Sequence, residues 1–188
     1  MRLPRKVASL LLAAGMAAGT AAAAVPARAD TVTSYVSFET ATLDSSSVWQ
    51  PTGLCLEADP GPHFVYQVAT QRCDTARNTA QQWLPVNQGG GVYKFVNQAV
   101  GWCLYTDTRN NGSPIALWDC SANISNTRWA WGGIGGVQHL ESRISGTTGH
   151  CLDVPMGQIL AGLWIQLWNC DQEPALSQDF IMGHVVVP

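Results

Sequence analysis

The chain has 188 residues, with 10 basic and 13 acidic side chains and a formal net charge of −3 at pH 7. Its length suits one domain with a hydrophobic core of its own. An acidic balance argues against nucleic acid and anionic lipid as partners, since basic patches supply the affinity for both.

Residues 1–29 have the pattern of a secretory signal peptide. A basic start, an apolar run and a small-x-small cleavage signal follow one another: Arg2, Arg5 and Lys6, then residues 7–18, then Ala27-Arg28-Ala29. The apolar run is too short to span a bilayer, and no later segment is long enough either. An alanine-rich core helix fits this ordered pattern less well. We therefore expect a secreted domain over residues 30–188, with no membrane span.

Removal of this segment makes the chain more acidic. It takes away four of the 10 basic residues and none of the 13 acids, which leaves a net charge of −7. A neutral ligand or a protein is the partner that such a surface favours.

One short unit occurs three times in the mature chain, at an interval of 48 residues. It reads Gly-x-Cys-Leu-x at residues 53–57, 101–105 and 149–153. A second cysteine and then an aromatic residue follow in each copy: Cys73 and Trp83, Cys120 and Trp129, Cys170 and Phe180. A fixed period of this length indicates one supersecondary unit that buries its apolar face against its copies. The copies span about 30–87, 88–134 and 135–188.

In chain order, the expected elements are short strands. Residues 31–43 predict a first strand, and residues 45–51 a lead-in that the other copies lack, which we interpret as an insertion. Further on, Val92–Val96 and Ile115–Trp118 are β-branched or aromatic runs bounded by turn residues. Glycine-rich joints separate the copies at 89–91 and 132–136. Because no mature segment shows a sustained helical period, the sequence predicts an all-β domain.

All six cysteines lie in the mature chain, which predicts disulfides in an exported protein. Of the 15 possible pairings, the repeat selects one within each copy: Cys55–Cys73, Cys103–Cys120 and Cys151–Cys170. Each loop would contribute roughly 3 kcal/mol in the chain-entropy model. We expect no metal site, because no two cysteines are closely spaced and the four histidines are scattered.

The strand before the last cysteine alternates in character. Leu163, Ile165 and Leu167 share one face and Trp164, Gln166 and Trp168 the other. The same register puts these residues of the other copies outward: Ala116 and Trp118, Ala69 and Gln71. It puts Ile115, Leu117, Val68 and Thr70 inward. The outward position two residues before the second cysteine is therefore Gln71, Trp118 and Trp168 in the three copies.

These motifs, in register three times, resemble the ricin B-chain type lectins and the related family 13 carbohydrate-binding modules. A further mark, Gln-x-Trp/Phe, occurs as Gln81-Gln82-Trp83 and Gln178-Asp179-Phe180, while copy two has Thr127-Arg128-Trp129. The resemblance covers residues 53–182. It implies a β-trefoil, in which three four-stranded units close a small barrel around the Gln-x-aromatic residues.

The resemblance also implies which side chains bind sugar. In this family the acid lies two residues after the first cysteine, and the aromatic lies two residues before the second cysteine. A polar residue lies two residues before that aromatic. The Asn and Gln of Asn-Gln-x-Trp complete the set. Copy three matches best, with Asp153, Gln166, Trp168 and Gln178, although Ser177 replaces the Asn. Copy two keeps Trp118 and Asn126 but has Tyr105 for the acid. Copy one has Glu57, Gln71 and Ala80, and is expected to bind nothing.

The chemistry of these side chains suits a neutral polyol. An indole covers the apolar face of a pyranose at little entropic cost, and a carboxylate accepts hydrogen bonds from neighbouring hydroxyls. Other roles stay open: Asp153 is able to cap a turn, and Trp118 and Trp168 to pack under a loop. The resemblance gives Trp102 and Trp164 no role.

The sequence therefore predicts a secreted, non-catalytic protein that recognises galactose-type or polysaccharide glycans, chiefly through copy three. The alternative is a lectin-like delivery subunit that binds a secreted toxin or enzyme and has lost sugar binding. We expect no enzyme and no cofactor, since the chain carries no motif for a nucleophile, a metal hydrolase or a phosphate loop.

Overall fold

The computed structural model describes residues 34–60, 66–122, 124–133, 136–146, 148–170 and 177–185. The expected signal peptide lies outside these residues. Within them, the regular elements are strands and single 3-10 turns, which confirms the all-β prediction. None of the helices in the described segments is long and apolar enough to cross a membrane.

Each copy supplies four strands. Copy one contains β1 (Tyr35–Leu43), β2 (Trp49–Pro60), β3 (Tyr66–Arg72) and β4 (Trp83–Gly89). Copy two contains β5 (Val92–Asn97), β6 (Cys103–Thr106), β7 (Ser113–Trp118) and β8 (Trp129–Gly132). Copy three contains β9 (His139–Ser142), β10 (His150–Asp153), β11 (Gln166–Asn169) and β12 (Phe180–Val185). The 3-10 turns are η1 (Thr79–Gln81), η2 (Ser125–Thr127) and η3 (Pro155–Gly157).

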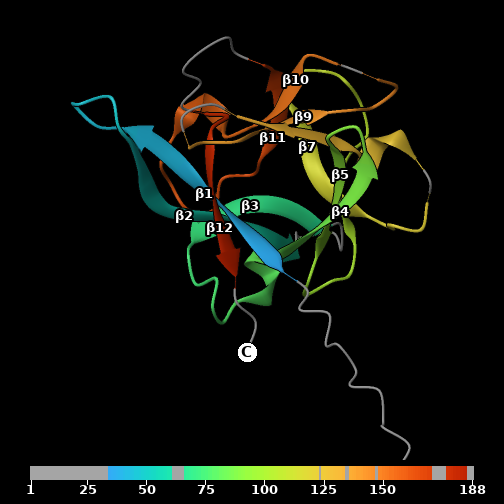
Figure 1. The fold of residues 1–188 in the computed structure, drawn as a ribbon, viewed down its shortest axis with the longest axis horizontal. Coiled ribbons are helices and arrows are strands. Elements are labelled where there is room, and N and C mark those ends of the chain that lie inside the picture. Colours follow the sequence, from blue (N-terminus) through green and yellow to red (C-terminus); the bar gives the residue numbers. More distant parts are fainter. Residues whose placement is uncertain are drawn as a thin grey trace, which may run out of the picture. The chain divides into compact units, whose positions relative to one another are not determined.

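The first and last strands of the copies close a barrel. Strand β1 pairs with β12 and β4, β4 with β5, β5 with β8, and β8 with β9. A bridge between Gln138, just before β9, and Phe180 of β12 completes the ring. Figure 1 shows β12 beside β1, so the two ends of the described chain meet. A closed ring leaves no free sheet edge, which explains why three short repeats are stable together.

The middle strands form three hairpins, β2–β3, β6–β7 and β10–β11, which pair with one another. Gln67 of β3 lies opposite Ala116 of β7, and Pro114 of β7 lies opposite Gln166 of β11. Trp164, just before β11, bridges Ala69 of β3. This threefold contact of hairpins over a barrel is the β-trefoil that the resemblance implied.

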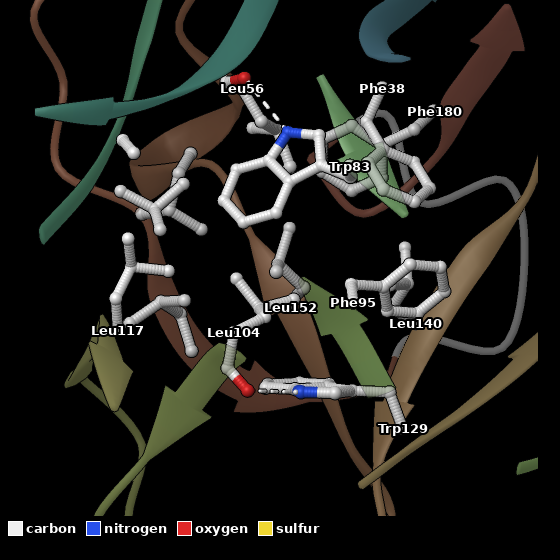
Figure 2. Packing of buried hydrophobic residues seen from close by; sticks show 14 of the residues in the cluster. Phe38, Leu56, Trp83, Phe95, Leu104, Leu117, Trp129, Leu140, Leu152 and Phe180 are labelled. Carbon is white, nitrogen blue, oxygen red and sulfur yellow. Dashed lines mark hydrogen bonds between the residues drawn. The ribbon is translucent and has the colours of Figure 1, made fainter. Parts of the chain in front are cut away.

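The repeated aromatics lie in the core, as predicted. Trp83, Trp129 and Phe180 are at most 1% exposed. The indole N–H groups of Trp83 and Trp129 donate to the carbonyls of Leu56 and Leu104, at 3.3 and 3.0 Å. Figure 2 shows these two equivalent bonds at separate places around one cluster. Because each indole keeps a hydrogen bond, its whole area is buried without leaving the N–H unsatisfied.

The three predicted disulfides are present, with Cα–Cα distances of 5.0 Å for Cys55–Cys73, 5.1 Å for Cys103–Cys120 and 4.9 Å for Cys151–Cys170. Each ties the start of a middle hairpin to its end. The carboxylate of Glu39 lies close to Cys55 and Cys73. Because these sulfurs are oxidised, they offer no thiolate to a metal.

The lead-in of copy one extends a hairpin. Strand β1 continues past the barrel and pairs with β2 as far as Leu43 and Trp49, and the tip of this hairpin projects at the left of Figure 1. Asp44 closes the turn, accepting the backbone N–H groups of Ser46 at 2.8 Å and Val48 at 3.0 Å. The insertion is thus ordered by one carboxylate that bonds the backbone of its own turn.

Alternation gives the expected faces, with one difference. Ile115, Leu117, Val68, Thr70, Ile165 and Leu167 are at most 1% exposed. Ala69 has the expected outward register but is fully buried. Its cross-strand neighbours are Glu57 and Trp164, whose longer side chains flank its methyl group.

Candidate functional site

The β10–β11 hairpin places the strongest candidates on one face. Asp153 lies opposite Gln166, and Cys151 lies opposite Trp168. Directly opposed residues of an antiparallel pair point to the same side, so the acid, the amide and the indole share the outward surface. Trp168 is 41% exposed there, which fits an open aromatic face rather than a side chain packed under a loop.

Two amide groups hold the carboxylate of Asp153. Gln166 donates Nε2 to Oδ2 at 2.7 Å, and Gln178 donates Nε2 to Oδ1 at 3.3 Å. Gln178 also donates to the carbonyl of Asn169 at 2.9 Å, which ties it to β11. Asp153 is only 4% exposed, so these bonds fix the direction in which it presents its oxygens. Three of the predicted ligands therefore form one connected cluster.

The turn η3 follows Asp153 in the chain. Its N-cap is Val154, which makes no side-chain cap hydrogen bond. The carbonyl of Ser177 instead accepts the Val154 N–H at 2.7 Å. Ser177 is thus held beside the cluster through its backbone, and its short side chain lies next to Gly157.

A loop of copy two supports the end of β11. The Asn169 N–H donates to Oδ1 of Asn111 at 2.8 Å, and the Gly112 N–H donates to the carbonyl of Leu167 at 2.8 Å. Both contacts flank Trp168 in the chain, so they fix the backbone that carries the indole. The sequence did not predict this role for Asn111: the tripeptide Asn111-Gly112-Ser113 fits the N-glycosylation pattern and lies among turn residues.

Copy two does not assemble its predicted ligands around an acid. The rings of Tyr105 and Trp118 stack, with centroids 5.4 Å apart and planes 27° apart. Nδ2 of Asn126 donates to the backbone carbonyl of Asp107 at 3.3 Å. The phenol that stands at the position of the acid therefore lies against the 51% exposed Trp118, where a sugar would have to stack.

Copy one contains an organised carboxylate that the sequence did not predict. Oε2 of Glu57 accepts Nδ2 of Asn78 and Nε2 of Gln81, both at 2.8 Å. Asn78 also caps η1 by accepting the Ala80 N–H at 3.0 Å. The motif places the amide at position 80, but the 3-10 turn brings Asn78 to the acid instead. Copy one thus has an acid with two amides, as in copy three, and lacks an aromatic at Gln71.

Two carboxylates outside this cluster have altered acidity. The hydroxyl and then the backbone N–H of Ser121 lower the pKa of Asp119. The backbone N–H groups of Val48 and Ser46 lower the pKa of Asp44. Both groups are exposed turn residues, so their hydrogen bonds organise loops.

Residues 46–180 match the model of the ricin-type β-trefoil lectin domain. The chain belongs to this family. The domain type is a non-catalytic carbohydrate-binding module, and the described structure has its lectin-like fold. No curated protein sequence matches the chain significantly.

Solved structures agree on the trefoil at low sequence identity. The designed three-fold symmetric protein ThreeFoil is 18% identical over 79% of this chain and 96% of its own, with a TM-score of 0.63. The ricin B-like lectin of Macrolepiota procera, in complex with lactose, is 13% identical over 80% of this chain and 94% of its own, with a TM-score of 0.55. The cytolethal distending toxin of Haemophilus ducreyi is 17% identical over 80% of this chain and 85% of the matched chain, with a TM-score of 0.55.

Proposed function

We propose that this protein is a secreted lectin that recognises galactose-type or polysaccharide glycans, chiefly through copy three. The observation that carries the proposal is the carboxylate of Asp153, held by Gln166 and Gln178 on the face that exposes Trp168. The family membership of the chain supports the class of ligand.

The cluster has the parts that a neutral sugar requires. The indole of Trp168 offers an apolar face to the C–H side of a pyranose. The oxygens of Asp153 accept ring hydroxyls through charge-assisted bonds, which are stronger than neutral ones. The amides of Gln166 and Gln178 keep the carboxylate in one orientation, so little side-chain entropy is lost on binding.

Secretion is part of the proposal. Three disulfides persist in an oxidising compartment and are rare in the cytosol. The signal pattern of residues 1–29 supports the same location. Mass spectrometry of the mature N-terminus tests this point, with Asp30 as the expected first residue.

Binding at one shallow site is expected to be weak, with a dissociation constant near 1 mM corresponding to about 4 kcal/mol. Retention on a polysaccharide matrix therefore measures it better than crosslinking of cells. Trp168→Ala should lose most of the retention seen for the wild type. Trp102→Ala is the matched control, because Trp102 is 40% exposed and lies outside the cluster. Equal retention of wild type and Trp168→Ala would remove copy three as the main site.

A protein partner is the second candidate, and one surface favours it. The loop between β10 and β11 exposes three large apolar side chains: Met156 at 84%, Ile159 at 52% and Leu160 at 56%. Exposed apolar groups in one segment are typical of protein contacts. If this role is correct, Ile159→Ser with Leu160→Ser abolishes capture of a co-secreted protein and leaves polysaccharide retention unchanged.

A further inference from the structure

We propose that copy one forms a second carbohydrate site, in which Trp164 of copy three supplies the aromatic face that copy one lacks. This inference rests on the proposed function for the class of ligand, a neutral pyranose. It does not depend on Asp153 or Trp168.

The site is a row of three residues, one in β2, one in β3 and one in the isolated bridge just before β11. Glu57 of β2 lies opposite Ala69 of β3, and Ala69 lies opposite Trp164. Opposed residues share a face, so Glu57 and Trp164 both point outward. With strands about 4.8 Å apart, their backbones are about 10 Å apart. Between them lies the fully buried methyl group of Ala69, so a sugar ring would contact the two longer side chains on either side of it.

The same row exists in every copy, and its third residue always comes from another copy. The rows are Glu57–Ala69–Trp164, Tyr105–Ala116–Gln67 and Asp153–Gln166–Pro114. In copy one alone, this row joins an acid to an aromatic. In copy three the exposed aromatic is Trp168, which lies two residues beyond Gln166 on β11 and opposite Cys151. The two sites would thus use an acid and an indole in different arrangements.

The carboxylate of Glu57 is prepared for a ligand. Both amides, from Asn78 and Gln81, bond the same oxygen, Oε2. Oε1 accepts no hydrogen bond from any residue that the structure describes. The side chain is partly exposed. An oriented carboxylate with one open oxygen is suited to accept sugar hydroxyls.

Trp164 is held over copy one by its backbone. Thr70 of β3 donates its N–H to the carbonyl of Leu163 at 2.9 Å and accepts the Gly162 N–H at 2.6 Å. Its hydroxyl donates to the carbonyl of Leu160 at 2.7 Å. On the other side, the Ile165 N–H donates to the carbonyl of Val68 at 2.8 Å. These bonds fix the backbone that carries Trp164, whose side chain is 39% exposed.

A second site changes how the protein would hold a polymer. Two weak sites on one rigid domain raise the effective affinity for a chain that reaches both, without any new contact. This would explain why copy one has an organised carboxylate although it lacks the usual aromatic, and why Trp164 of copy three is exposed beside it.

The test is a titration followed by NMR of the tryptophan indole N–H signals. The probes are methyl glycosides of galactose, glucose, mannose and xylose, and the signals are assigned with Trp164→Ala, Trp168→Ala and Trp102→Ala. We expect one probe to shift the Trp164 signal in the wild type and, with the same dissociation constant, in Trp168→Ala. Glu57→Gln should weaken this response at least tenfold, and the Trp102 signal should not move.

The possible outcomes separate the second site in copy one from the proposed function of copy three. A shift of Trp168 alone, or a Trp164 response that Glu57→Gln leaves unchanged, overturns the second site and leaves the proposed function standing. A shift of Trp164 alone supports the second site and overturns the assignment to copy three. If no probe shifts either signal, both are overturned. An unchanged far-ultraviolet spectrum and melting temperature of each variant show that lost binding is not lost fold.

Discussion

Gln166 donates its amide to Asp153 across the β10–β11 pair, with Nε2 2.7 Å from Oδ2. The acid is nearly buried, so this bond affects both stability and ligand geometry. A buried carboxylate that loses one partner keeps its desolvation cost without the compensating bond.

Gln166→Met should therefore lower the free energy of unfolding by about 1–3 kcal/mol and weaken sugar binding at copy three. Methionine keeps the length of the side chain and removes its donor. Denaturant unfolding and a sugar titration measure the two effects. Gln88→Met, at an exposed position of β4 outside the β2–β3, β6–β7 and β10–β11 hairpins, is the control and should change neither quantity by much. A stable Gln166→Met variant with wild-type binding would show that Gln178 alone suffices.

Gln166→Glu tests the same contact through pH. Two carboxylates then face each other, and repulsion raises the pKa of the pair. A raised folded-state pKa means that the variant is least stable, relative to wild type, above that pKa. The deficit should shrink as the pH falls toward about 4, where one proton is shared. Thermal melts of both proteins between pH 4 and 8 measure the difference, and a deficit independent of pH would contradict a charge effect.

The core tryptophans should respond quite differently from the exposed ones. Trp129→Phe removes the donor to the Leu104 carbonyl and leaves a cavity in a fully buried site. We expect a loss of roughly 2–4 kcal/mol in the free energy of unfolding. Trp118→Phe, at a 51% exposed position, should cost less than about 0.5 kcal/mol. Similar costs for the two variants would mean that Trp129 is not a core residue in solution.

The fold could be predicted from the sequence because the repeat carries it three times. Cysteines, inward leucines and core aromatics recur at one interval, so a single wrong assignment would have conflicted with two other copies. The faces of β7 and β11 followed from alternation for the same reason. The resemblance then added the trefoil, which the pattern of strands alone leaves open.

Contacts between the copies could not be predicted in this way. The row from Glu57 through Ala69 to Trp164 depends on how the hairpins meet, and residues 57 and 164 are far apart in the chain. Asn78 was missed because η1 displaces the amide by two positions from the motif. The Tyr105–Trp118 stack was missed because alternation gives the face of a side chain and not its rotamer.

The turn at the tip of the β1–β2 hairpin should loosen in acid. The Val48 and Ser46 N–H groups lower the pKa of Asp44, so its charged form is the one that the turn stabilises. For a lowered pKa, this contribution is present above the ordinary value and is lost as the pH falls through the lower one. The amide chemical shifts of Ser46 and Val48 should titrate together, with a midpoint below the ordinary value of 3.8. In Asp44→Asn both shifts should be independent of pH in this range.

Copy two should gain a site when its phenol is replaced by an acid. Tyr105 stands where Asp153 stands in copy three, and its ring covers one face of Trp118. In Tyr105→Asp the indole is uncovered and a carboxylate enters the same outward face, opposite Ala116. A sugar that binds copy three should then also shift the indole N–H signal of Trp118. Tyr105→Ala uncovers the ring without adding an acid, so it separates the two effects. If Tyr105→Ala gains the response as fully as Tyr105→Asp, stacking alone is sufficient and the carboxylate is not what defines a site in this protein.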